Sequence, residues 1–470
     1  MIDDIRYATR SLVKKPGFTA VAIITLALGI GASTAIFSVV DAVLLRPLPF
    51  PQQERIVEVR ELSEQGRGMS FADPNFDDLR QRSKTFEALA RYGSGPQAVV
   101  GGSEPVRTNV CIASADFFRV LGVQPLLGRT FSPEVVAEDK QVAVVSFGFW
   151  KRFLGERQVL DGTIVRLQNR TFAVIGVLPA EAEFPPGIDV WTPAEIYPPV
   201  PSRTAHNWRV AGRLRAGVTL EQAAADALAI GQQLKREHGA STDAVGFGLT
   251  PLRERFVRDL RSVLLVVGGA VGLLLLISCS NVANLLLARA LALRHQIAVR
   301  AALGASRWRL ARQFIAETTL LTLVAAALGV AFAFWGVDLI LGAYHGNLPR
   351  VGQIGVNATV LLFTISISAL LGLGLGLLPA FSFSPRQLQD DLQSRGRAKL
   401  TSRSNSRVRS SLVIAQVALT LMLLIGAGLL GRSFQRLMEV SPGFEPDSTV
   451  AMELATQFSP EAAAQREPAR

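Results

Sequence analysis

Five long apolar runs dominate the hydropathy pattern of the chain. Each of them reaches the roughly 20 residues that a helix needs to cross the hydrocarbon core of a bilayer. Lipid offers backbone polar groups no other partner, so each run is expected to be helical. The runs cover residues 18–45, 263–288, 314–341, 358–381 and 412–431. The pattern therefore predicts a polytopic α-helical membrane protein with about five transmembrane helices.

The long region between the first two runs has a different pattern. The stretches QVAVVSFGFW and RTFAVIGVLP are short and β-rich. The stretches NFDDLRQRSKTFEALARY and TLEQAAADALAIGQQLKREHG are typical of amphipathic helices, the second with Thr219 as N-cap and Gly239 as its end. We expect a large α+β domain between helices 1 and 2, folded as two lobes.

Charge is concentrated in three short segments that flank the apolar runs. Residues 1–16, 289–312 and 382–410 carry net charges of +2, +6 and +5, whereas the whole chain carries +11. If all five runs cross the membrane, these segments lie on one side. Lysine and arginine mark the cytoplasmic side in short loops. The N-terminus is therefore predicted to be cytoplasmic and the large domain periplasmic. This topogenic role explains the basic balance without nucleic-acid binding.

Composition and motifs argue against several other classes of protein. The chain has 470 residues, of which 49% are hydrophobic and 19% charged, as in a membrane protein with a sizeable soluble part. Two cysteines, Cys111 and Cys279, are too few for a disulfide framework, and the four histidines show no metal-ligand spacing. Neither a catalytic constellation nor a phosphate-binding Gly-Lys motif occurs. We expect no enzyme activity and no cofactor, and any ATP-driven work needs an ATPase on another chain.

Polar residues are few within the apolar runs. Glu317 lies one turn into the third run, and it is expected either to pair with Arg312 or a neighbouring helix or to take part in coupling. Asn281 and Asn284, near the inner end of the second run, are expected to bond across helices. The pairs Gly268–Gly272, Gly372–Gly376 and Gly31–Ala35 have the spacing of close helix contacts.

The N-terminal stretch MIDDIRYATRSLVKKPGF predicts a short helix in the inner membrane interface. Its apolar stripe is flanked by Arg6, Arg10 and Lys14. The stripe consists of Ile2, Ile5, Ala8, Leu12 and Val13. The apolar run that follows is too long for a cleavable signal peptide, so it is interpreted as an uncleaved anchor.

The basic segment RHQIAVRAALGASRWRLARQF, residues 294–314, lies between the second and third runs. Gly304 is a natural helix stop and Ser306 a natural N-cap, so the segment is expected to fold as a short helix, a turn at 303–305 and the start of the third span. Such a helix–turn under the membrane could serve as a handle for a soluble partner. A solvated, topology-fixing loop explains the arginines equally well.

The run SCSNVANLLLARALALRHQIAVRAALGASRWRLARQFIAETTLL strongly resembles the FtsX-like permease domain of the MacB family of ATP-binding-cassette transporters. The family usually carries Glu where this chain has Gln296. The matching residues are Asn281, Ala283, Asn284, Leu285, Arg289, Arg294, Ile297, Arg300, Ala302, Leu303, Gly304, Ala305, Gln313 and Glu317. Outside the membrane, SADFFRVLGVQPLLGRTF, FAVIGVLPAEAEFPPGIDVWTP and WRVAGRLRAGVTLEQA look like the family's periplasmic core domain.

The fifth run extends the resemblance. The chain is similar to the first half of the duplicated permeases of Acidobacteria, and RSSLVIAQVALTLMLLIGAGLLGRSFQRLMEVSPGFEPD is similar to the opening of their second half. On this interpretation the chain is truncated within the second repeat. The implied organisation is an interfacial helix (1–16), helix 1 (17–45), a periplasmic MacB-like core domain (46–261), helix 2 (262–288), a cytoplasmic coupling segment (289–312), helix 3 (313–341), a periplasmic loop (342–357), helix 4 (358–381), a cytoplasmic basic linker (382–410), helix 5 (411–431) and a periplasmic tail (432–470).

The resemblance implies the permease subunit of a MacB-type efflux system in the bacterial inner membrane. The implied partners are a separate ATPase subunit, a second permease copy or the missing second half, the lipid bilayer and a periplasmic adaptor. Contacts with the ATPase are expected at Arg294, Gln296, Ile297, Arg300, Ala301, Leu303, Gly304, Ala305 and Arg307, with Asn281, Asn284 and Glu317 at the membrane interface. The alternatives are an FtsX-like scaffold or signalling protein that transports nothing, or a truncated remnant.

Overall fold

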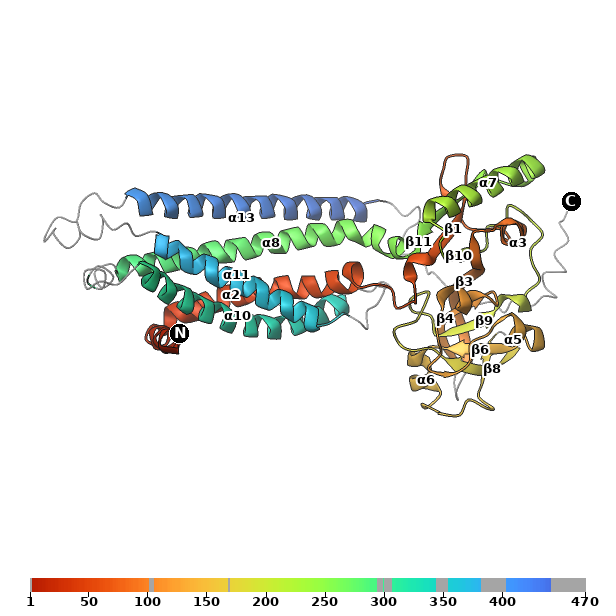
Figure 1. Ribbon diagram of the computed structural model, residues 1–470, viewed down its shortest axis with the longest axis horizontal. Coiled ribbons are helices and arrows are strands. Elements are labelled where there is room, and N and C mark those ends of the chain that lie inside the picture. Colours follow the sequence, from red (N-terminus) through yellow and green to blue (C-terminus); the bar gives the residue numbers. More distant parts are fainter. Residues whose placement is uncertain are drawn as a thin grey trace. The chain divides into compact units, whose positions relative to one another are not determined.

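A computed structural model describes residues 2–100, 105–167, 170–293, 299, 307–343, 354–381 and 403–440. The described chain divides into two units (Figure 1). One unit, the membrane unit, contains residues up to Leu45 and those from Leu260 onward. The other, the core domain, runs from Arg46 to Asp259. The predicted fold class is confirmed, since five helices are long and apolar enough to cross a membrane and an α+β domain lies between the first and the second.

The membrane unit is built from long helices. These are α1 (Ile2–Val13), α2 (Pro16–Val40, followed by a π-helical turn at Asp41–Leu45), α8 (Leu252–Ala292), α10 (Arg307–Ala343), α11 (Ala358–Phe381) and α13 (Arg403–Met438). A hydrophobic core joins α2, α8, α10 and α11, and Leu26, Ile30, Val282 and Leu321 are buried within it. The side chains of α13 that the structure describes are mostly exposed.

Close approach of α10 to its neighbours depends on glycine. A Cβ at Gly31 of α2 would lie 2.9 Å from the carbonyl oxygen of Gly329. A Cβ at Gly376 of α11 would lie 2.7 Å from Cα of Ile315, and the hydroxyl of Thr318 donates to the carbonyl of Gly372 at 2.6 Å. Two of the predicted small-residue pairs thus form helix contacts, whereas Gly268 and Gly272 face open space.

The core domain contains one mixed sheet, with eleven strands among the described residues. Its main order is β11-β1-β10-β3-β4-β9-β6-β8-β5. Most neighbours are antiparallel, and β4–β9 and β6–β8 are parallel. The strands are β1 (Ile56–Leu62), β2 (Gly68–Met69), β3 (Phe86–Val100), β4 (Pro105–Ala113), β5 (Leu127–Gly128), β6 (Val142–Val145), β7 (Ile164–Leu167), β8 (Arg170–Val177), β9 (Val190–Pro193), β10 (Arg209–Leu214) and β11 (Gly246–Pro251). The helices are α3 (Asp73–Arg82), α4 (Phe117–Leu121), α5 (Pro133–Glu138), α6 (Phe147–Phe153) and α7 (Leu220–His238).

Several local predictions for this domain are confirmed. RTFAVIGVLP forms β8, and α7 begins with a capping box in which Thr219 and Gln222 bond each other's backbone. The β-rich prediction for QVAVVSFGFW is right for Val142–Val145 but wrong for its second half, where helix α6 begins at Phe147. The hydroxyl of Ser146 then caps the N-terminus of α6.

The helix predicted over residues 75–92 is wrong in its second half. Helix α3 ends at Arg82, and Phe86 begins β3, which lies between β10 and β4. The side chains of residues 88–92 are all buried, so the segment lacks the polar face of a surface helix and the alternation of a half-buried strand. The segment is extended because it pairs with two neighbouring strands. The periodicity of its own residues does not predict this conformation.

The predicted N-terminal helix is present as α1, but its apolar stripe is narrower than expected. Ala8 and Leu12 are buried, whereas Val13 is 72% exposed. The two cysteines are both free and lie in different units.

Candidate functional site

Most of the residues predicted to contact an ATPase lie outside the described residues. These are Arg294, Gln296, Ile297, Arg300, Ala301, Leu303, Gly304 and Ala305. Arg307 is the first residue of α10. The coupling role of this segment therefore stays a prediction. The helices on either side of it, α8 and α10, are described and can be analysed.

An ion pair joins the two helices that flank the segment. Nη2 of Arg289, in the last turn of α8, lies 2.6 Å from Oε1 of Glu317 on α10. Arg289 is 9% exposed and Glu317 7%. The predicted pairing of Glu317 with a neighbouring helix is thus present.

The same guanidinium contacts two further helices. Its Nη2 donates to the hydroxyl of Ser11 on α1 at 2.7 Å. Its central carbon lies 4.7 Å from the ring centroid of Phe18, near the start of α2, which is a cation–π contact. Arg289 therefore links α1, α2, α8 and α10 at one point.

Burial of these charged groups costs free energy that their contacts only partly offset. Nε and Nη1 of Arg289 are buried without a hydrogen-bond partner among the described residues, and Glu317 Oε1 is close to Nη2 without a well-aligned hydrogen bond. A buried pair of this kind gains little net stability over an apolar replacement, yet loss of one partner leaves an uncompensated charge.

The membrane unit contains further polar residues. Asn281 and Asn284 are half-buried, and Oδ1 of Asn284 has no hydrogen-bond partner in the described part of the chain. At the other end of the helices, Asp41 is buried and accepts a hydrogen bond from Nδ2 of Asn357 at 2.8 Å. Asp338 is exposed. Among the described residues, no ladder of charges follows the length of the helices.

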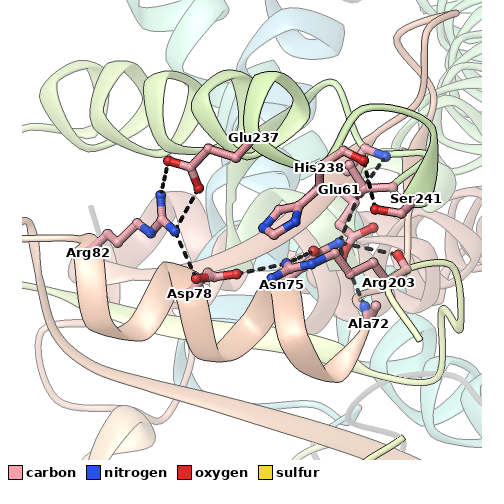
Figure 2. A network of polar contacts seen from close by, with 11 residues as sticks. Glu61, Ala72, Asn75, Asp78, Arg82, Arg203, Glu237, His238 and Ser241 are labelled. Atoms are coloured by element: carbon pink, nitrogen blue, oxygen red, sulfur yellow. Dashed lines mark hydrogen bonds and ion pairs between the residues drawn. The ribbon is translucent and has the colours of Figure 1, made fainter. Parts of the chain in front are cut away.

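The core domain contains a second polar cluster (Figure 2). Glu61, on β1, has no exposed surface. Its Oε1 accepts from the backbone N–H of Ala72 at 3.0 Å and from Nδ2 of Asn75 at 2.8 Å. Burial nevertheless raises the pKa of the Glu61 carboxyl above its usual value. His206 Nδ1 lies 3.1 Å from the other oxygen, Oε2.

The cluster continues through ion pairs toward α7. Nη1 of Arg203 lies 2.7 Å from Asp78 Oδ2, and Arg82 pairs with both Asp78 and Glu237 at 3.1 and 2.9 Å (Figure 2). The bond from Arg82 lowers the pKa of the Glu237 carboxyl to about 2. These contacts hold α3, α7 and the segment before β10 together, so the cluster fixes the shape of this end of the domain.

Neither cluster resembles a catalytic or metal site. In the described ranges, no group of three or more histidine, cysteine, aspartate or glutamate side chains could hold a metal ion. The acidic groups of both clusters already face basic partners. In both clusters, the buried charged side chains thus connect neighbouring secondary-structure elements.

Sequence reasoning identified Glu317 but missed its partner Arg289, and Ser11, to which Arg289 donates, as site residues. Arg289 had two signals, its place at the inner end of an otherwise apolar run and its match to the permease family. His206 had none, because Glu61 and His206 are distant in sequence and meet only in the folded domain.

Comparison with known proteins adds independent information. The family described as MacB-like periplasmic core domain matches residues 19–230, and the family described as FtsX-like permease C-terminal matches residues 268–390. Macrolide export ATP-binding/permease protein MacB 2 of Aeromonas hydrophila is 26% identical over 299 residues, which is 61% of this chain and 44% of that protein. Macrolide export ATP-binding/permease protein MacB of Agrobacterium fabrum is 25% identical over 278 residues, which is 58% of this chain and 42% of that protein.

This chain therefore spans less than half the length of these relatives. Among solved structures, the periplasmic region of MacB from Actinobacillus actinomycetemcomitans has 15% sequence identity and a TM-score of 0.34, covering 44% of this chain and 92% of that one. A domain of a putative permease from Porphyromonas gingivalis has 17% identity and a TM-score of 0.34, covering 43% and 92%.

Proposed function

Because this chain belongs to the MacB- and FtsX-like permeases of ATP-binding-cassette transporters, we propose that it is the permease subunit of an export system driven by a separate ATPase. In this proposal the ATPase moves the segment 294–312, and the helices carry that motion to the core domain. The matched relatives are macrolide exporters by name. We infer the same direction of transport for this chain and assign no particular substrate.

The observation that carries the proposal is the Arg289–Glu317 pair. The two residues lie on α8 and α10, on either side of the segment that would receive the push. A buried pair holds these helices together, so a force on the segment acts on both of them. This form of transmission needs no polar path across the membrane, in agreement with the few charges among the described spans.

The proposal includes an orientation. The N-terminus and residues 289–312 would be cytoplasmic and the core domain periplasmic, in the inner membrane of a bacterium. The basic flanks support this placement. Cysteine substitutions at exposed Lys15 and Gln65, in a chain with Cys111→Ser and Cys279→Ala, test it in whole cells. A membrane-impermeant maleimide should label Gln65→Cys before lysis and Lys15→Cys only after lysis.

Co-purification tests the function itself. The tagged chain is co-expressed with each ATP-binding-cassette ATPase subunit of its genome and isolated in mild detergent. We expect one ATPase to be retained and its ATP hydrolysis to change when the permease is added. Arg300→Glu should weaken retention, whereas Arg236→Glu, an exposed site on α7, should not. Retention of no ATPase would favour a scaffold that transports nothing.

A further inference from the structure

Helix α1 presents a cationic face directly opposite its buried side. Ala8 and Leu12 are buried against the helices of the membrane unit. At 3.6 residues per turn, Arg6, Arg10 and Lys14 form a stripe on the other side, and all three are exposed. The stripe has no acidic partner among the side chains that the structure describes.

Two exposed apolar side chains border this stripe. Tyr7 is 41% exposed and Val13 72% exposed, one on each side of the three cations. An aromatic side chain next to lysine and arginine is typical of helices that lie at the level of lipid headgroups.

The connection to α2 places this face at the membrane surface. Only Lys14 and Lys15 separate α1 from α2, which begins at Pro16 and belongs to the first candidate span. The corner is held by hydrogen bonds to the carbonyl of Leu12, from the hydroxyl of Thr19 at 2.8 Å and from the backbone N–H of Lys15 at 3.3 Å. Helix α1 therefore lies within one turn of the end of a membrane-spanning helix.

We propose that the Arg6–Arg10–Lys14 face of α1 binds the anionic phospholipid headgroups of the adjoining leaflet. Each cation close to an anionic membrane surface contributes an attraction that falls with salt. The exposed Tyr7 and Val13 side chains lie at the acyl boundary beside the headgroups. The inference depends on α2 crossing the membrane and not on the presence of an ATPase.

Bound headgroups would also stabilise the contacts of Arg289 with its neighbouring helices. The buried face of α1 includes Leu12, and its neighbour Ser11 accepts the hydrogen bond from Arg289. Anionic lipid that holds α1 in place therefore holds Ser11 against the guanidinium that joins α8 to α10. The lipid composition of the membrane would then set how firmly these helices are joined.

The experiment uses the full chain in nanodiscs of neutral phosphatidylcholine, with or without phosphatidylglycerol. Hydrogen exchange measures the protection of the α1 amides, and native mass spectrometry measures the lipid retained. We expect phosphatidylglycerol to increase both for the wild-type chain. The variant R6Q/R10Q/K14Q should lose the increase, with retention weakened roughly fivefold for each cation removed.

Two control variants separate this effect from net charge and from misfolding. K84Q/K140Q/R236Q removes three exposed cations of the core domain and should respond like the wild type. R6K/R10K keeps the charge of α1 and should also respond. Equal protection in both lipids for the wild type would overturn the proposal, and so would loss of the response in R6K/R10K.

A third arm distinguishes a membrane surface from a free anion. Glycerol phosphate is added to the phosphatidylcholine nanodiscs in place of the anionic lipid. Full protection by the soluble anion would show a phosphate site and contradict headgroup binding. None of these measurements contains an ATPase, so their failure leaves the co-purification test of the proposed function untouched.

Discussion

Nδ1 of His206 lies 3.1 Å from Oε2 of Glu61, a carboxylate with no exposed surface. The same nitrogen is 2.9 Å from the backbone carbonyl of Ser70. A backbone carbonyl can only accept, so Nδ1 carries the proton. His206 thus joins the segment before β10 to β1, at the place where α3 begins.

Replacing His206 should loosen α3. His206→Ala removes the hydrogen bond to the carbonyl of Ser70 and the N–H group nearest to the buried Oε2 of Glu61, which makes no hydrogen bond of its own among the described residues. We expect a cost of about 0.5–1.5 kcal/mol. Because Glu61 also holds the backbone of Ala72 and the side chain of Asn75, we expect faster hydrogen exchange in α3. His238→Ala, at the end of α7, serves as the control. An equal effect of both substitutions would contradict this role for His206.

A second prediction concerns the dependence of stability on pH. Burial, with a contribution from nearby Asp189, raises the pKa of Glu183 from 4.5 to about 7. The folded core domain then binds a proton more tightly than the unfolded chain does. The stability from this group is complete below pH 4.5 and is lost as pH rises toward about 7.

Glu183→Gln should therefore stabilise the protein at pH 8 relative to the wild type and flatten this part of the profile. Glu181→Gln, an exposed neighbour, should change little. Thermal unfolding between pH 4 and pH 8 measures both variants. If the stability of the wild type rose between pH 4.5 and 7, and that of Glu183→Gln rose with it, a raised pKa of Glu183 would be excluded.

Hydropathy and charge predict much of this molecule because lipid permits few structures. The five spans and the α+β class follow from the apolar runs and from the pattern between them. Strand β3 does not, because its buried segment acquires its conformation from β10 and β4. The Arg289–Glu317 and Glu61–His206 contacts also depend on the fold, since no local spacing brings residues so distant in sequence together.

The Arg289–Glu317 pair gives a third prediction. Glu317→Gln and Arg289→Gln each leave one buried charge unpaired and should destabilise the membrane unit by about 3–5 kcal/mol. The double variant R289Q/E317Q should lose less than the sum of the two. Asp338→Asn, on the exposed side of α10, is the control.

Thermal unfolding in detergent measures this cycle. Additive losses would show that the two charges do not act on each other. The same variants should still retain the partner ATPase in the co-purification test, because neither residue is among the predicted ATPase contacts at 294–307. The change in ATP hydrolysis that the permease causes should be smaller, because the pair is proposed to transmit the motion.

The packing of α11 on α10 gives a fourth prediction, with a control two residues away. A side chain at Gly376 meets the backbone of Ile315 at 2.7 Å, whereas one at Gly374 meets nothing within 4 Å. Gly376→Val should therefore push the helices apart and destabilise the protein by about 1–3 kcal/mol. Gly374→Val places the same residue type in the same helix on an open face, so the two share any cost of helix propensity. Their difference in thermal midpoint isolates the contact, and equal midpoints would show that α11 does not pack on α10 through this face.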